Sequence, residues 1–463
     1  MRKAEDADAW LSNIELASML SMLRENGATE VLYKILPKNA NSKNQVYLGG
    51  KDPSEFSKIP SGDMTMHVST STKNGKQEAV FRSDLDFYWL TEAGQAAHAP
   101  NAKMIFYPQY PEVRFSGFLL GCKDAPSSLW AKPQRGTEAG RILVLGVGNR
   151  KKVIGVTLPP ESPAAKEILA TGPHAPYGAM NILPMLGNGA GNPFRELMAE
   201  LCKIHKRIWV PSTRLDPAGL MVPCNSSNGN GNTLESLLGI PSNGYSKPDF
   251  KGWELKVRQV PNVDKPGASA VTLFTPEPTS GFYTEKGVAE FVRRYGYAAR
   301  NGCEDRLNFG GIHRAKAAAN KRTGLRLVLD GFKSETEYSP AGSVVLLDSK
   351  DDVAASWSFV KLMNHWKAKH AQAAFIPVQQ RLQPERQYRF GRRILLGEGA
   401  EFGLLLRAFH EGKVYYDPGI KLEAASTKEA KHKQRSQFRV RSKNLPALYE
   451  SSRIVDACDE ASS

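Results

Sequence analysis

The chain has 463 residues, 41% of them hydrophobic and 24% charged, and its 62 lysines and arginines outnumber 47 acidic residues, for a net charge of +15. The length predicts two or three domains, and the composition is typical of soluble globular proteins. No apolar run reaches the ~18 residues of a membrane span, and the acidic N-terminus is unlike a signal peptide, so we expect no membrane association. The positive charge favours a polyanion as partner, although charge alone fits an ordinary basic protein equally well.

The cysteines are odd in number and scattered, with no Cys-x-x-Cys pair: Cys122, Cys202, Cys224, Cys303 and Cys458. This pattern is typical of a reducing compartment and excludes a zinc ribbon or finger. We therefore expect a cytoplasmic protein.

The first 171 residues predict a mainly β domain that begins with one amphipathic helix over residues 5–26. Nine short strands with turn residues between them are predicted after it: 30–36, 45–48, 64–69, 78–81, 87–90, 103–107, 113–119, 141–146 and 153–157. Helix-length segments between the strands are absent, so the pattern favours a barrel or sandwich over a doubly wound α/β fold.

Short stretches of this domain resemble a known DNA-binding domain. They are Lys34-Ile35-Leu36, Asn39, Asn44 to Leu48, and His67-Val68-Ser69. They are similar to the N-terminal effector domain of EcoRII-type restriction enzymes, a pseudobarrel of the plant B-three type. The resemblance implies a domain that reads a second copy of the recognition sequence, with loops 38–44 and 71–76 facing DNA. Solvated polar turns are an equally good explanation of these two loops.

Residues 172–193 are rich in Gly, Pro and Ala and predict a linker. The run Gly187 to Gly191 is superficially like a phosphate-binding loop. No strand precedes it and no Gly-Lys-Ser/Thr follows, so we expect no nucleotide cofactor.

The second domain, residues 194–463, begins with a predicted helix over 194–206 and a polar loop over 225–232. Thr233 is a candidate N-cap for a short helix over 234–238, which carries Glu235. Alternating strands and helices further along the chain predict a mixed α/β fold.

Glu254 and Lys256 lie in a predicted strand over 253–257, where alternation places both side chains on one face. A two-residue turn at Lys251-Gly252 would make Asp249 oppose Glu254, about 5 Å away between Cβ atoms. Two such carboxylates repel each other unless a cation lies between them, and Mg²⁺ prefers carboxylate oxygens. The pattern therefore indicates metal-assisted phosphodiester hydrolysis, although Glu-x-Lys alone is usually a surface ion pair.

The spacing Glu235, Pro248-Asp249, Glu254-Leu255-Lys256 resembles the catalytic core of the MvaI/BcnI restriction endonucleases, relatives of the mismatch-repair nuclease MutH. The resemblance covers roughly residues 194–450 and implies a PD-(D/E)XK nuclease fold. It further implies that Asp249 and Glu254 hold Mg²⁺, that Lys256 serves the attacking water, and that Glu235 completes the site.

A basic segment near the C-terminus, residues 431–443, contains no acidic residue. On a strand, Arg435, Gln437, Arg439 and Arg441 would share one face, and Arg and Gln can pair with guanine and adenine in the major groove. A solvated face is the ordinary explanation of such a run, but a nuclease site in the same domain favours DNA. Our candidates for contact with DNA are His432, Lys433, Arg435, Gln437, Arg439 and Arg441, followed by Arg306, His313 and Arg314.

Together these patterns predict a type II restriction endonuclease that acts on double-stranded DNA. The resemblance implies a monomer, a short target of CC-N-GG type and 5′-phosphate products; the effector-like domain adds two-site activation. Two alternatives stay open, a MutH-like nicking enzyme that a partner recruits and a DNA-binding protein that does not cleave.

Overall fold

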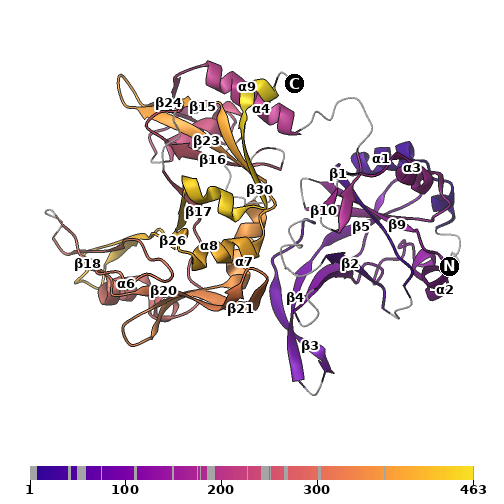
Figure 1. Ribbon diagram of the computed structural model, residues 1–463, viewed down its shortest axis with the longest axis horizontal. Helices are drawn as coiled ribbons and strands as arrows, with labels where there is room; N and C mark the ends of the chain where they lie inside the picture. The colour runs from indigo at the N-terminus through magenta and orange to yellow at the C-terminus, as the bar shows by residue number, and fades with distance from the viewer. Residues whose placement is uncertain are drawn as a thin grey trace. The chain divides into compact units, whose positions relative to one another are not determined.

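The computed structural model describes residues 8–39, 43–49, 59–73, 76–108, 112–148, 151–174, 176–177, 179–184, 193–226, 228–240, 250, 252–264, 269–300, 304–369 and 372–461. The chain forms two compact units, residues 1–190 and 191–463 (Figure 1). The Gly-rich run at 187–191 lies outside the described residues.

The N-terminal unit contains two sheets. In spatial order, the first consists of β11 (Pro176–Tyr177), β12 (Met180–Ile182), β1 (Ala28–Ile35), β9 (Ile142–Gly148), β10 (Lys152–Leu158), β5 (Asp86–Leu90) and β6 (Ala96–His98). The second consists of β2 (Gln45–Gly49), β8 (Glu112–Ser116), β7 (Lys103–Tyr107), β4 (Lys76–Asp84) and β3 (Thr65–Lys73). All pairings are antiparallel except that of β5 with β10.

An aromatic cluster joins these two sheets. Phe87 of β5 contacts Phe115 of β8 edge to face, with ring centroids 5.0 Å apart. The indole of Trp89 donates to the carbonyl oxygen of Phe118 over 2.6 Å. Gly155 of β10 is needed beneath the cluster, because a Cβ there would lie 2.3 Å from the ring of Phe87. This packing confirms a mainly β N-terminal unit, and all nine predicted strands are present.

The predicted helix over 5–26 is wrong as one element. The described part is a 3₁₀ turn at Ala9–Ser12 followed by α1 (Leu16–Glu25), with Glu15 extended between them. The carbonyl oxygen of Ile14 accepts a hydrogen bond from Ala164 at the start of α3 (Pro163–Thr171), and this tertiary contact explains the break. The short helix α2 (Lys132–Thr137) and a 3₁₀ turn at Ser128–Trp130 complete the unit. Residues 176–182 of the predicted linker form β11 and β12, and β12 pairs with β1.

The second unit is built on a mixed sheet around β23 (Gln372–Arg381). Its other strands are β13 (Val210–Pro211), β16 (Glu254–Gln259), β24 (Gln387–Phe390), β25 (Arg393–Glu398) and β30 (Ser451–Asp456). β16 runs parallel to β23, whereas β24 and β25 are antiparallel to it. Helices α4 (Pro193–Lys206) and α5 (Gly229–Leu237) contribute Leu197, Leu201 and Leu234 to the core of this sheet.

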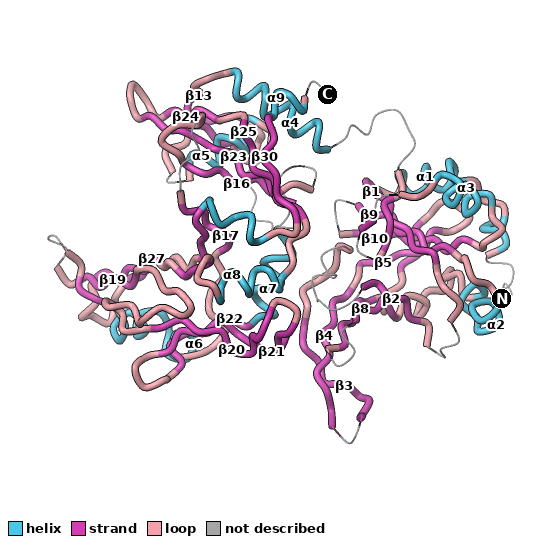
Figure 2. Tube along the Cα trace, in the orientation of Figure 1, coloured by secondary structure: helices cyan, strands magenta, loops and turns pink. Residues whose placement is uncertain are grey.

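Smaller sheets complete the second unit (Figure 2). They are the hairpin β14 (Thr213–Leu215) and β15 (Met221–Pro223); β17 (Ala270–Phe274), β29 (Phe438–Arg441) and β26 (Val414–Tyr416); β18 (Tyr297–Ala298), β19 (Arg306–Gly310), β27 (Gly419–Glu423) and β28 (Lys431–Lys433); and β20 (Arg326–Ser334), β21 (Glu337–Leu347) and β22 (Val353–Ser358). The remaining helices are α6 (Phe282–Tyr295), α7 (Phe359–Lys369), α8 (Phe402–His410) and α9 (Ala457–Glu460). The unit is mixed α/β, as predicted.

A disulfide joins Cys202 of α4 to Cys458 of α9, 256 residues apart in sequence. The scattered cysteines gave no indication of this pair, because the two helices meet only in the folded unit (Figure 1). None of the described helices is long and apolar enough to cross a membrane.

Candidate active site

The predicted turn before Glu254 is present. Phe250 and Trp253 exchange two backbone hydrogen bonds, of 3.0 and 2.8 Å, and Gly252 between them has a φ of +94°. This is the left-handed region that glycine enters without steric cost. Phe250 and Trp253 both pack on the core of the sheet, which fixes the turn at the start of β16.

Glu254 and Lys256 form an ion pair at this end of β16. The Lys256 ammonium donates to Oε1 of Glu254 over 2.5 Å. The Glu254 side chain is only 2% exposed and that of Lys256 21% exposed. Leu255 between them is buried in the opposite direction, in the core of the sheet. A buried carboxylate needs a positive partner, so this pair differs from the exposed ion pair that Glu-x-Lys usually forms.

Glu235 lies half-buried on α5, which packs against both β16 and β14. The prediction that Thr233 is the N-cap of this helix is wrong, because α5 begins at Gly229 within the predicted loop. The Thr233 hydroxyl instead donates to the carbonyl oxygen of Gly229 over 2.6 Å and accepts from the amide of Thr213 over 3.0 Å. Thr233 thus attaches the β14–β15 hairpin to the helix that carries Glu235.

Asp249 lies outside the described residues. No cluster of three or more His, Cys, Asp or Glu that could hold a metal ion occurs within the described ranges. The described part of the predicted site therefore consists of Glu235, Glu254 and Lys256. Its oxygen ligands are carboxylates, which suit a hard divalent cation.

The prediction that the basic segment lies on one strand is only partly correct. Residues 431–433 form β28 in the sheet with β27, whereas β29 begins at Phe438 in the sheet with β17 and β26. His432, Lys433 and Arg435 are exposed. The segment between the two strands lies alongside residues 417–419. The backbone amides of Asp417 and Gly419 donate to the carbonyl oxygens of Gln437 and Arg435.

The predicted alternation holds for the packing side of this segment. Ser436, Phe438, Val440 and Ser442 are buried, and Arg441 is exposed. Gln437 is also buried and accepts from Thr272, and half-buried Arg439 pairs with Asp417 at 2.8 Å. Both of these side chains have partners within the protein, so a contact with DNA would have to replace or share them.

The second group of DNA candidates lies apart from β29 in sequence. Arg306 of β19 forms an ion pair with Glu423 of β27, with 3.4 Å between Nε and Oε1. The guanidinium of Arg314 lies over the ring of Tyr415, 4.7 Å from the ring centroid. His313 is only 2% exposed. Its ring stacks on Phe309 and its Nε2 lies 2.8 Å from the Thr323 hydroxyl, so a contact with DNA would require it to leave this packed position.

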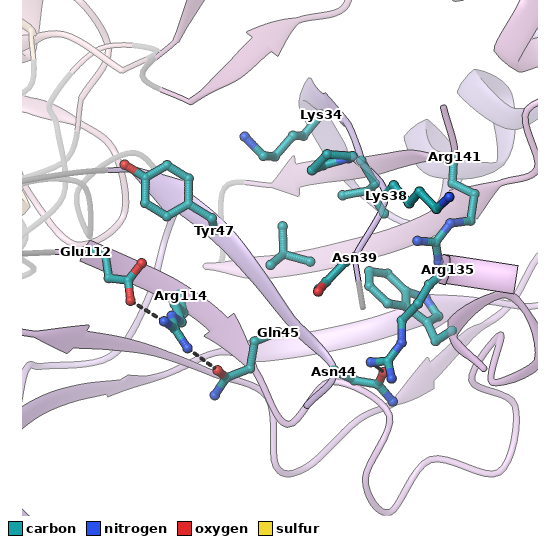
Figure 3. A pocket seen from close by; sticks show the side chains of 14 residues that line it. Lys34, Lys38, Asn39, Asn44, Gln45, Tyr47, Glu112, Arg114, Arg135 and Arg141 are labelled. Atoms are coloured by element: carbon teal, nitrogen blue, oxygen red, sulfur yellow. Dashed lines mark hydrogen bonds and ion pairs between the residues drawn. The ribbon is translucent and has the colours of Figure 1, made fainter. Parts of the chain in front are cut away.

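The N-terminal unit contains a basic cavity, which is lined in part by the stretches that resemble the effector domain but whose buried arginines, Arg135 and Arg141, sequence patterns did not indicate. The cavity has a volume of about 360 Å³ and is lined by Lys34, Lys38, Arg114, Arg135 and Arg141 but by a single acid, Glu112 (Figure 3). Arg135 is 4% and Arg141 1% exposed, and the Nε atom of neither has a hydrogen-bond partner among the described residues. Burial lowers the pKa of Arg141, nearby Glu138 offsets this, and Arg135 lowers it further.

A model of the MvaI/BcnI restriction endonuclease family matches residues 198–449, which is more than half of the 463 residues. Among solved structures, the complex of the restriction endonuclease MvaI with its cognate DNA is 19% identical, over 58% of this chain and 99% of that chain, with a TM-score of 0.43. MvaI without DNA is 17% identical, over 58% of this chain and 100% of that chain, with a TM-score of 0.33. No curated protein matches.

The family match defines the class of the protein, a DNA endonuclease that hydrolyses phosphodiester bonds. Within this class, the chain belongs to the MvaI/BcnI restriction endonuclease family. The match begins in α4 and ends at residue 449, so it includes none of the N-terminal unit.

Proposed function

We propose that the chain is a Mg²⁺-dependent type II restriction endonuclease, with Glu235, Asp249, Glu254 and Lys256 as its catalytic residues. The observation that carries this proposal is the buried Glu254–Lys256 pair, held by a tight turn at the end of a core strand inside the family match. The basic surplus of the chain favours the same polyanionic substrate.

Each of the four residues has a proposed role. Asp249 and Glu254 would hold Mg²⁺, which supplies charge stabilisation and lowers the pKa of a water when it is bound. Lys256 orients the attacking water and places positive charge where the phosphate gains negative charge. Glu235 approaches from α5 and completes the site. Cleavage would leave a 5′-phosphate, and the target would be a short sequence of CC-N-GG type.

On the DNA-binding side, we propose that His432, Lys433, Arg435 and Arg441 contact DNA from the exposed side of their segment. Gln437, Arg439, Arg306 and Arg314 would contribute after giving up or sharing their present partners. We further propose that the enzyme acts as a monomer, which cuts the two strands in turn.

For the N-terminal unit we propose DNA binding that activates cleavage at a second site. The basic cavity supports this, because the buried guanidinium groups of Arg135 and Arg141 donate to neutral oxygens, of Asn44 and Leu129, and have no ion pair with a carboxylate among the described residues; such groups favour an anion, and phosphate is the anion of DNA. Lys38, Asn39 and Asn44 line the cavity and belong to the predicted DNA-facing loop 38–44, of which residues 40–42 lie outside the described residues.

The catalytic proposal is tested with Lys256→Ala on a long unmethylated DNA in Mg²⁺, with EDTA as control and sequencing of fragment ends. We expect discrete ends at one short motif for the wild type, and cleavage slowed on the order of 10²–10³-fold for the variant, with DNA affinity retained. Lys203→Ala, which removes an exposed Lys–Glu pair on α4, is the matched control.

Near wild-type cleavage by Lys256→Ala would overturn the assignment. Nicks in one strand alone would favour a MutH-like enzyme. Salt-sensitive DNA binding without cleavage would favour a DNA-binding protein that does not cleave. Two-site activation predicts faster cutting of plasmids with two target sites than with one.

A further inference from the structure

A row of small residues lies beside Glu254 in the central sheet. Glu254 of β16 pairs with Ala373 of β23, and Ala373 pairs in turn with Gly397 of β25. Laterally paired residues project from the same face of a sheet. Ala373 is fully buried and Gly397 has no side chain, so space exists on this face next to the Glu254 carboxylate.

The ring of Tyr449 occupies this space. A Cβ built on Gly397 would lie 2.5–2.7 Å from the ring atoms Cδ2, Cε2 and Cγ of Tyr449. The ring therefore lies where the Gly397 side chain would be, on the face that bears Ala373 and Glu254. It also meets Phe375 edge to face at 6.1 Å between centroids. Phe375 pairs with Lys256, which is on the same face as Glu254.

The Tyr449 ring thus lies at β25 on the face of the sheet that bears Ala373 and Glu254, and its hydroxyl is not hydrogen-bonded to the Glu254 carboxylate in this structure. The residue is 5% exposed, and the 3₁₀ turn at Ser442–Leu448, with Leu448 fully buried, holds its backbone in place. Burial raises the pKa of Tyr449, and the charge of Glu254 raises it further, as is typical of a phenol close to a carboxylate.

We propose that Tyr449 is a positioning residue of the cleavage reaction, whose hydroxyl bounds the Glu254 carboxylate electrostatically on the buried side while Lys256 pairs with it from the more exposed side. The proposal rests on the function proposed above, because it assigns Glu254 as a metal ligand. Residues that orient a metal ligand in this way typically contribute 10–100-fold to metal affinity or activity. Nothing in the local sequence around Tyr449 predicts this role, since it depends on the register of three strands.

The test is Tyr449→Phe, which keeps the ring and removes only the hydroxyl. We expect single-turnover cleavage to slow about 10–100-fold and the Mg²⁺ concentration for half-maximal rate to rise severalfold, while DNA affinity without metal and the melting temperature stay unchanged. Tyr388→Phe is the matched control, because Tyr388 is a 3% exposed tyrosine on β24 of the same sheet, in the core on the opposite face from Tyr449. It should cleave within about twofold of the wild-type rate.

Gly397→Ala provides an independent variant, since its Cβ displaces the Tyr449 ring without removing the hydroxyl. Slower cleavage is expected here too, with a lower melting temperature. Wild-type rate and Mg²⁺ dependence in Tyr449→Phe would overturn the proposal, and so would a rate loss matched by equal losses of stability and DNA affinity. The wild type and Lys256→Ala separate this proposal from the proposed function. If the wild type cleaves and Lys256→Ala does not, these two results for Tyr449→Phe reject only the role of Tyr449. If the wild type itself does not cleave, the proposed function is rejected instead.

Discussion

The buried imidazole of His313 makes the stability of the second unit depend on pH. Burial lowers the pKa of His313 from 6.5 to about 4, against smaller raising effects from the Gly311 backbone and Asp417. The folded state therefore binds fewer protons than the unfolded state between these two values. The stabilising contribution of neutral His313 is therefore fully present above pH 6.5 and is lost as the pH falls toward 4.

The lowering of the His313 pKa from 6.5 to about 4 corresponds to about 3 kcal/mol of stability in total, of which about 2 kcal/mol is already lost between pH 7 and pH 5. His313→Gln removes the titrating group and can still meet the Thr323 hydroxyl, so we expect its unfolding free energy to fall about 2 kcal/mol less over this range. Urea unfolding can be followed by tryptophan fluorescence, because buried Trp357 is close to the site: its ring centroid lies 4.6 Å from that of Tyr416, whose ring contacts His313.

His432→Gln, which removes an exposed histidine, is the control and should keep the wild-type pH dependence. Equal pH dependence in the wild type and His313→Gln would refute the reasoning. Loss of sequence-specific DNA binding in His313→Gln at pH 7.5, with stability intact, would instead return His313 to the DNA-reading residues.

Two further predictions concern the disulfide and the basic segment. Cys458→Ser, or reduction of the wild type, should lower the unfolding free energy of the second unit by about 2–5 kcal/mol, because the bond closes a loop of 256 residues; an unchanged denaturation midpoint would contradict this. Lys433→Ala should weaken DNA binding about equally for all sequences and reduce the slope of log affinity against log salt by about 1, which filter binding at several salt concentrations measures; a loss confined to the target sequence would indicate base contact instead.

The turn before Glu254 could be predicted because its signals are local. Gly252 permits the turn, and alternation then places Glu254 and Leu255 on opposite faces. The start of α5 could not be predicted, since glycine and asparagine are poor helix formers. Gly229 is required there because a Cβ would lie 2.6 Å from the Tyr388 hydroxyl, a contact between segments about 160 residues apart.

The same distinction applies to the candidates for DNA contact and to Tyr449. Alternation correctly predicted which side of residues 436–442 is buried, but it could not show that Asp417 pairs with Arg439 or that His313 lies between aromatic rings. The position of Tyr449 follows from strand register, which a single sequence does not specify.

The parallel pairing of β16 with β23 also has a consequence for synthesis of the chain. Glu254 lies opposite Ala373, so about 120 further residues must leave the ribosome before the strand that carries Glu254 and Lys256 gains its neighbour. Such a long-range pairing forms slowly, and β30 (Ser451–Asp456) joins the sheet only about 70 residues after the end of β23. A nascent chain that has not yet reached β23 would thus contain Glu254 and Lys256 without the strand that β16 pairs with, so their buried ion pair can form only after β23 has been made.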